Sequence, residues 1–200
     1  MTRVRAVEQS TRERLLRAAR ELTEEGGYAT ASVLAIAERA GLGAGTLYRH
    51  FGSKAELFAE LFRDACEREI LAMQEVAAAT ETAGAADRLG SVVGTFAERA
   101  LLNPRLAWAL IAEPVDPLVD AERLAYRAHL ARLLAAGLRE AIEGGELPAQ
   151  DADLTAAALV GGVGEALVGP LSPVAAGSAS THETVEAIRA FTRRAVGFPA

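Results

Sequence analysis

Hydrophobic residues along this chain recur at intervals of three or four, which is the spacing of amphipathic helices. In the first such segment Leu15, Ala19 and Leu22 form the apolar stripe. A capping-box sequence at residues 10–13 predicts the start of this helix, and the glycines at 26–27 predict its end. Further along the chain the same spacing continues, and the alternation typical of strands is almost absent. The sequence therefore predicts an all-α protein.

Start and stop signals divide the chain into nine predicted helices. Ser32, Ser53 and Ser180 stand where a hydroxyl can cap a helix, and a Glu follows Ser53 and Ser180 at the capping-box position. Pro104 and Pro117 suit the first position of a helix, because the fixed φ of proline is preorganised there. Stops are predicted at residues 26–27, 41, 80–86, 103, 114, 144–145 and 169–170, and residues 172–179 are predicted to form a loop.

Residues 32–54 contain two short helices joined by a turn with Gly41 and Gly43, which predicts a helix–turn–helix. If Leu47 and Phe51 face the core, a rotation of 100° per residue sets the direction of the other side chains. The outward side then holds Gly45, Thr46 and Arg49, the flanks hold Tyr48 and His50, and Ala44 lies on the inner side. A helix face of small residues with one arginine can enter a DNA major groove.

This outward face predicts particular contacts to DNA. Arg49 can donate two hydrogen bonds to a guanine edge, and Thr46, Tyr48 and His50 can reach phosphate oxygens at the groove walls. Lys54 falls in the first turn of the next helix, where free backbone N–H groups also favour a phosphate. The alternative is a helical hairpin that binds no nucleic acid. The glycines at residues 41–45 are not expected to bind a nucleotide. The dinucleotide-binding pattern Gly-x-Gly-x-x-Gly lacks its third glycine here, and the segment follows a helix rather than a strand.

Charge is distributed unevenly along the chain. Residues 1–54 hold nine basic and six acidic residues, whereas residues 55–200 hold twelve basic and twenty-one acidic residues, and the net charge of the whole chain is −6. A basic N-terminal segment joined to an acidic remainder favours a polyanion-binding module next to one that avoids polyanions. With 50% hydrophobic and 24% charged residues, the chain can bury a core, which excludes intrinsic disorder.

The segment 32–58 resembles the N-terminal signature of the TetR family of transcriptional regulators. The matching pieces, at fixed spacing and without gaps, are Ile36-Ala37, Ala40-Gly41, Gly45-Thr46-Leu47-Tyr48, His50-Phe51 and Ser53-Lys54 with Leu57. The resemblance covers about residues 10–60, and the rest of the chain is similar in length and helical plan only. It implies a nine-helix architecture with a helix–turn–helix DNA-binding domain at 1–54 and a helical ligand-binding and dimerisation domain at 55–200.

The resemblance also implies a mode of action and a set of contacts. It implies a homodimeric repressor that leaves a double-stranded operator when a small molecule enters the C-terminal domain. By motif position, the implied phosphate contacts are Thr46, Tyr48, His50 and Lys54, and the implied base contacts are Ala44, Gly45 and Arg49. Ser32 is implied to cap its helix and to touch the DNA backbone. The family often has Ser or Thr where this chain has Gly43, which offers no side-chain acceptor, so no side-chain phosphate contact is expected there.

Residues 151–168 are rich in glycine and alanine, and they predict a helix that packs closely against another. An interior glycine costs a helix about 1 kcal/mol relative to alanine, and close helix approach can offset that cost. The resemblance implies a four-helix dimer bundle from the last two helices, with interface residues Ala157, Gly161, Gly164, Val185, Ile188 and Phe191. Packing within one chain is the alternative. The apolar run 154–171 is interrupted by glycines, Glu165 and Pro170, so no membrane span is predicted.

An effector pocket is predicted among the middle helices. Its candidate lining residues are Phe62, Cys66, Phe96, Leu101, Trp108, Ile111, Tyr126 and Leu130. Trp108 and Tyr126 are the preferred candidates, because an aromatic body with a polar tip suits a mostly apolar cavity. No basic cluster accompanies these residues, which favours a neutral or cationic apolar ligand. For each residue alone, ordinary core packing is the alternative.

Four acidic residues surround a proline-rich turn: Glu113, Asp116, Asp120 and Glu122. They are predicted to form a solvated turn, with a site for a cationic group as the alternative. The single Cys66 excludes an intramolecular disulfide and a multi-cysteine zinc site, and no second cysteine is present to resolve an oxidised thiol.

Other function classes lack their characteristic parts. The histidines are isolated, and the sequence contains no P-loop, nucleophile elbow or zinc-protease motif, so neither an enzyme nor a metal or cofactor site is predicted. No apolar stretch follows the basic start, so no signal peptide is predicted, and a cytoplasmic location is expected. Two alternatives remain open: a small-molecule-binding dimer with a vestigial DNA head, and a constitutive DNA binder without a ligand. Operator binding separates the first from a regulator, and release by added compounds separates the second.

Overall fold

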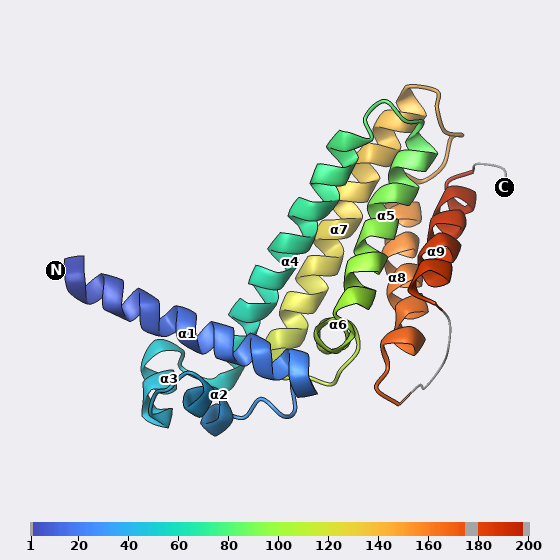
Figure 1. The fold of residues 1–200 in the computed structure, drawn as a ribbon. Helices are drawn as coiled ribbons and strands as arrows, with labels where there is room; N and C mark the ends of the chain where they lie inside the picture. Colours follow the sequence, from blue (N-terminus) through green and yellow to red (C-terminus); the bar gives the residue numbers. More distant parts are fainter. Residues whose placement is uncertain (1, 175–179, 198–200) are drawn as a thin grey trace. The chain divides into compact units, whose positions relative to one another are not determined.

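The computed structural model describes residues 2–174 and 180–197 of the chain, and within these ranges it consists of helices and connecting turns (Figure 1). No strand occurs in the described ranges. The nine helices of this part of the chain are α1 (Thr2–Gly26), α2 (Val33–Arg39), α3 (Ala44–His50), α4 (Lys54–Ala79), α5 (Ala85–Leu102), α6 (Pro104–Ile111), α7 (Pro117–Glu143), α8 (Ala152–Leu171) and α9 (Thr181–Ala195). The predicted all-α class is confirmed.

Most helix boundaries follow the local signals in the sequence. Ser180 and Glu183 form the complete capping box that starts α9. The predicted start of the first helix is wrong, because α1 begins at Thr2 and residues 10–13 lie inside it. The stretch before them has no glycine or proline to interrupt a helix. α8 continues two residues beyond Gly169 to Leu171, and residues 175–179 of the predicted loop lie outside the described residues.

The chain divides into two compact units. The first unit comprises Met1–Ala65 and Pro104–Arg123, and thus α1, α2, α3, the first part of α4, α6 and the start of α7. In this unit α1 packs on α2 and on α6, and α2 packs on α3. Its buried side chains include Leu15, Ile36, Leu47, Leu57 and Phe58. Burying their apolar surface against one another holds the short helices α2 and α3, which are too short to be stable in isolation.

The second unit comprises Cys66–Asn103 and Leu124–Ala200. Here the most extensive contact between two helices is that of α5 with α9. Two glycines on α5 allow this approach: a side chain at Gly94 would overlap that of Arg189 on α9, and one at Gly90 would touch Arg193. α8 packs on both α5 and α9. The second unit is therefore held by helix faces in close contact, with small residues at the points of closest approach.

α8 is apolar on more than its buried side. By length and composition it is the one helix of the described residues that could cross a membrane, with a mean hydropathy of 1.5 over the best window, and 33% of that window is buried. A single such helix is weak evidence for a membrane span, because core helices of soluble proteins meet the same criterion. Its exposed positions include the small residues Ala157 and Gly161 together with one bulky apolar residue, Leu154, which is 67% exposed.

Candidate nucleic-acid interface

The turn between α2 and α3 has the geometry of a helix–turn–helix. Ser32 caps α2 by accepting a hydrogen bond from the Ala35 N–H at 3.1 Å, as predicted. α2 ends at Arg39 with Ala40 as its C-cap, and the next residue, Gly41, has a φ of +64°, in the left-handed region that favours glycine. Arg14 of α1 donates to the Ala40 carbonyl at 2.6 Å, which satisfies an orphan acceptor at the end of α2. The turn is thus fixed both by its own residues and by a side chain from another helix.

α3 presents most of the faces that the periodicity predicts, but Thr46, predicted on the outward side, is half-buried. Leu47 and Phe51 are buried, Gly45 and Arg49 are exposed, and Tyr48 is 57% exposed. The other three predicted contact residues of this segment, Ala44, Thr46 and His50, are half-buried. The Arg49 guanidinium donates to the Thr46 hydroxyl at 3.2 Å, so these two polar groups already lie together on the outer face.

The glycines of α3 leave its N-terminal end open. A side chain at Gly43 or Gly45 would meet no atom within 4 Å, so another molecule can approach the backbone here. Gly43 is the N-cap of α3 and provides no side-chain hydrogen bond, as the sequence predicts.

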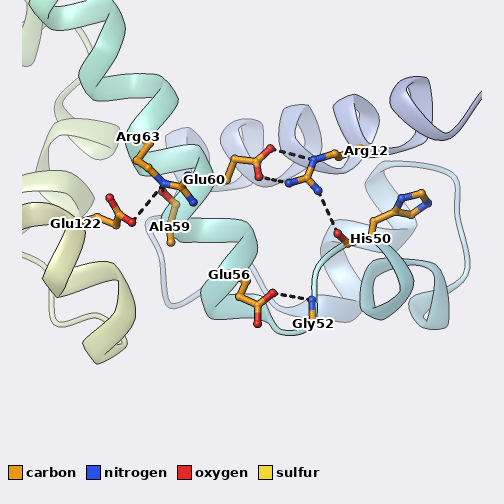
Figure 2. A network of polar contacts seen from close by, with 8 residues as sticks. All are labelled: Arg12, His50, Gly52, Glu56, Ala59, Glu60, Arg63 and Glu122. Carbon is orange, nitrogen blue, oxygen red and sulfur yellow. Dashed lines mark hydrogen bonds and ion pairs between the residues drawn. The ribbon is translucent and has the colours of Figure 1, made fainter. Parts of the chain in front are cut away.

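Arg12 of α1 fastens the C-terminal end of α3, as Figure 2 shows. Its guanidinium donates to the His50 carbonyl at 3.1 Å and to both carboxylate oxygens of Glu60 on α4, with the Nε–Oε1 distance 3.1 Å. The same group lies 4.3 Å from the centre of the Phe51 ring, within the range of a cation–π contact. One side chain therefore links α1, α3 and α4. Its role was not predicted, since an arginine on a helix looks the same in a sequence whether solvated or engaged.

The segment between α3 and α4 and the next turns of α4 carry three further polar contacts, two of which are drawn in Figure 2. Ser53 accepts from the Glu56 N–H at 3.1 Å, and the Glu56 carboxylate accepts from the Gly52 N–H at 2.9 Å. The predicted capping box is thus present in a variant form. The Glu56 carboxylate accepts from the N–H of Gly52, whereas in the standard capping box it would accept from the N–H of Ser53. Further along α4, Arg63 pairs with Glu122 of α7 at 3.3 Å.

Lys54, a predicted phosphate contact, lies against aromatic rings at the start of α4. Its ammonium donates to the Tyr28 carbonyl at 3.0 Å and lies 4.1 Å from the centre of the Tyr28 ring and 5.3 Å from that of Phe58. Burial lowers the pKa of Lys54, and the negative charge of Glu113 opposes that shift. One of the three N–H donors of this lysine is therefore used inside the protein.

Glu113, at the end of α6, is not part of a solvated turn, and that prediction is wrong for this residue. Its carboxylate accepts hydrogen bonds from the backbone N–H groups of Tyr28 and Ala29, at 2.9 and 3.2 Å. The cause is long-range: 85 residues separate Glu113 from Tyr28 in the sequence. No local pattern could reveal that these N–H groups, which lie between α1 and α2, need an acceptor.

The predicted pocket residues fall into both compact units. Phe62, Trp108 and Ile111 belong to the first unit, where Phe62 is buried and the other two are half-buried. The second unit holds Cys66, Phe96, Leu101, Tyr126 and Leu130, of which Cys66 and Leu130 are buried.

Within the second unit, Tyr126 lies in an environment that sequence reasoning only partly identified. Burial first, and then the nearby Cys66 and Glu69, raise the pKa of the Tyr126 hydroxyl, whereas Arg99 lowers it in part. Arg99 also forms a bidentate pair with the Glu69 carboxylate, with an Nε–Oε2 distance of 2.6 Å and an Nη2–Oε1 distance of 3.0 Å. Glu69 and Arg99 were not predicted as part of this site. Both follow the helical charge pattern of a surface, which carries no signal that they meet.

The predicted interface residues also differ in their surroundings. Val185 and Ile188 are buried inside the single chain, so packing within one chain accounts for them. Ala157 and Gly161 are exposed, Gly164 is half-buried and Phe191 is 42% exposed. These four keep surface that a second chain could cover.

Comparisons with known proteins agree with this architecture. The family model described as bacterial regulatory proteins of the tetR family matches residues 15–61. The transcriptional regulator UidR of Escherichia coli K12 is 40% identical over 67 residues, which cover 34% of this chain and 34% of UidR. The transcriptional repressor KstR of Mycolicibacterium smegmatis is 31% identical over 140 residues, which cover 70% of this chain and 66% of KstR. The chain thus spans about a third of UidR and about two thirds of KstR.

A solved structure extends the similarity of fold to almost the whole chain. The regulator FadR of Bacillus subtilis, in complex with stearoyl-CoA, superposes with a TM-score of 0.75 at 21% identity and covers 94% of this chain and 99% of FadR. Together with the helix–turn–helix in the first unit, these similarities identify the protein class. The chain belongs to the TetR family of bacterial regulatory proteins.

Proposed function

We propose that this protein is a dimeric, ligand-responsive transcriptional repressor that binds a near-palindromic operator in double-stranded DNA. The single observation that carries the proposal is the outer face of α3: Gly45, Arg49 and Tyr48 are exposed on a helix whose inner side is buried and whose end is fixed by Arg12. A rigid, exposed helix with small residues and an arginine suits the major groove. Because its target is DNA, we propose that it acts in the cytoplasm.

We propose two kinds of contact for the residues on and around α3. Arg49, with the backbone and small side chains of Ala44 and Gly45, would read base edges. The residues proposed to bind phosphates are Ser32, Thr46, Tyr48, His50 and Lys54. For Lys54 this contact would use the N–H donors that the Tyr28 carbonyl leaves available.

We propose that the dimer forms through the exposed face of α8 with Phe191 of α9. Gly161 supports this assignment, because a side chain there would meet no atom of its own chain within 4 Å. An interior glycine that nothing in the chain requires costs the helix about 1 kcal/mol, which a close approach by a second chain would offset. A two-fold dimer also presents two recognition helices to two half-sites, about 34–36 Å apart or a multiple of that.

We propose that the effector is an apolar small molecule bound in the second unit. The candidate contacts there are Cys66, Phe96, Leu101, Tyr126 and Leu130, with the hydroxyl of Tyr126 as the polar group that orients the ligand. Support comes from the relative FadR, whose structure contains stearoyl-CoA, a molecule with a long apolar chain. The proposed ligand differs in its head, since no basic cluster accompanies these residues.

Selection of bound duplexes from a random pool tests this function. The purified protein is mixed with the pool at physiological salt, and bound duplexes are amplified and sequenced. We expect a near-palindromic consensus with half-sites about one helical turn apart, and release of that duplex by the right apolar compound. Absence of any enriched sequence from a folded, dimeric protein would contradict operator binding. The α3 variant Arg49→Ala serves as the matched control for base-specific enrichment.

A further inference from the structure

The α6–α7 corner contacts the DNA-binding head through a carboxylate that the family signature at residues 32–58 does not include. Both oxygens of Glu113 are used: Oε2 accepts from the Tyr28 N–H at 2.9 Å and Oε1 from the Ala29 N–H at 3.2 Å. These N–H groups belong to the turn after α1, which leads directly to Ser32, the N-cap of α2. Charge-assisted hydrogen bonds of this kind are about twice as strong as neutral ones.

The backbone around Glu113 is itself fixed. Arg123 of α7, whose side chain is 12% exposed, donates to three carbonyls at the end of α6: Leu110 at 3.0 Å, Ala109 at 3.2 Å and Glu113 at 2.9 Å. These bonds satisfy carbonyls that would otherwise lack a partner at the helix end. The backbone of Glu113 is therefore held in place by Arg123, and its carboxylate holds the backbone of the turn after α1.

The turn is built to receive this carboxylate. Gly27 has a φ of +83°, and a Cβ placed there would lie 3.0 and 3.1 Å from the two Glu113 oxygens. Any side chain at this position would be strained by the backbone and crowded by the carboxylate. The glycine thus serves the approach of Glu113 as well as the end of α1.

The same peptide segment holds Lys54 on its other side. Tyr28 donates its N–H to Glu113 and accepts at its carbonyl from the Lys54 ammonium at 3.0 Å. The Tyr28 ring lies edge-on to Phe58, with ring centres 4.6 Å apart, and Lys54 lies over both rings. Burial, followed by the negative charges of Asp116 and Glu113, raises the pKa of the Tyr28 hydroxyl. The Glu113 carboxylate, the Tyr28 backbone and the Lys54 ammonium are therefore joined by consecutive hydrogen bonds.

We propose that Glu113 is a positioning residue for operator binding: by holding the Tyr28–Ala29 backbone, it fixes Lys54 in the orientation that meets DNA phosphates. The inference rests on the proposed function. It adds a residue outside the helix–turn–helix, in the α6–α7 corner, to those that set operator affinity. Glu113 itself touches no DNA and acts through Lys54.

The test compares two Glu113 variants with a matched control on the operator selected by the wild-type protein. Glu113→Asp keeps the charge but withdraws the carboxylate by one methylene, and Glu113→Gln keeps the length but leaves one of the two N–H groups without an acceptor. Glu122→Gln is the control, because it removes a carboxylate that pairs with Arg63 of α4 and does not touch the turn. We expect both Glu113 variants to bind the operator about tenfold more weakly and the control to stay within about twofold of wild type.

A double-mutant cycle with Lys54→Ala distinguishes positioning from a general loss of stability. If Glu113 acts through Lys54, Glu113→Asp costs less than about threefold once Lys54 is absent, because the contact it positions is gone. Equal costs in the two backgrounds overturn the inference, as does wild-type affinity of Glu113→Asp. If the wild-type protein selects no operator at all, the proposed function fails instead, which is a separate result.

Amide hydrogen exchange keeps the test independent of operator affinity. In Glu113→Asp the Tyr28 and Ala29 amides should exchange faster, while amides inside α4 keep their wild-type protection. Unchanged protection of these two amides would show that Glu113 does not hold the turn and would overturn the inference. Both measurements use the whole chain at a temperature below the unfolding temperature of each variant. That unfolding temperature is determined by circular dichroism.

Discussion

Within each of the two compact units of this protein, a different kind of interaction predominates. In the first unit, side chains from distant parts of the chain bind the backbone at helix ends: Arg12 at His50, Arg14 at Ala40, and Glu113 at Tyr28. In the second unit such contacts also occur, from Glu146 to the Ala85 N–H at 2.9 Å and from Gln150 to the Val196 carbonyl at 3.0 Å, but the most extensive contact is the packing of α5 on α9. The first arrangement fixes the orientation of short helices that would not be stable in isolation. A fixed orientation suits the proposed reading of DNA by α3. The second leaves small residues of α8 exposed, where we propose that a second chain packs.

The largest expected effect comes from cavities of equal size in the two units. Leu47 of α3 and Leu138 of α7 are both fully buried, so Leu47→Ala and Leu138→Ala should each lower the free energy of unfolding by about 2–5 kcal/mol. Denaturant melts measure this loss. At equal fractions of folded protein, only Leu47→Ala should weaken operator binding, because Leu47 seats the recognition helix. Equal weakening by Leu138→Ala would show that the two units do not divide these tasks.

The next effect concerns the exposed face of α8. Gly161→Glu should leave the monomer folded, since nothing in the chain occupies that position, but it would bury an unpaired charge in the proposed dimer. We expect the dissociation constant of the dimer to rise by at least about a hundredfold, or about 2.7 kcal/mol, measured by analytical ultracentrifugation. Ala136→Glu on α7, at an exposed alanine outside the proposed interface, is the control. A Gly161→Glu protein that remains dimeric would place the interface elsewhere.

A smaller effect should separate the arginines of the two units. Arg12→Lys removes a planar group that binds a backbone carbonyl, a carboxylate and a ring at once, so it should cost about 1–3 kcal/mol of folding free energy. Arg99→Lys alters a partly exposed pair with Glu69 and should cost less than about 1 kcal/mol. Thermal and denaturant unfolding measure both. If Arg99→Lys costs as much folding free energy as Arg12→Lys, the carbonyl and ring contacts of Arg12 add nothing beyond its ion pair.

Much of the fold and of the DNA-binding face could be predicted because the signals are local. The caps at Ser32 and Ser180, the glycine stop at Gly41 and the buried pair Leu47 and Phe51 each act within a few residues. The anchoring contacts of the first unit could not be predicted in this way. Each joins residues far apart in the chain, and a charged residue gives the same local pattern whether it faces water or a backbone group.

The second unit shows a different limit of sequence reasoning. Val185 and Ile188 stand at helical spacing on α9, and both are buried, whereas Phe191 at the next such position is 42% exposed. Periodicity marks such positions as apolar. It does not say whether they cover the chain's own core or a partner. In the structure both side chains are buried within the single chain, where α9 packs on α5. Gly161 on α8 differs in this respect, because nothing within the chain occupies the space beside it, and the proposed interface is placed there for that reason.

We propose that the exposed face of α3 reads base identity while the residues around it hold that face in place. The most direct test measures the affinity of wild-type protein and Arg49→Ala for every single-base variant of the selected operator. We predict that Arg49→Ala loses about 1–3 kcal/mol of discrimination at one symmetric pair of positions and keeps its preferences elsewhere. An equal loss of affinity for all sequences, with every base preference intact, would contradict base reading by this face.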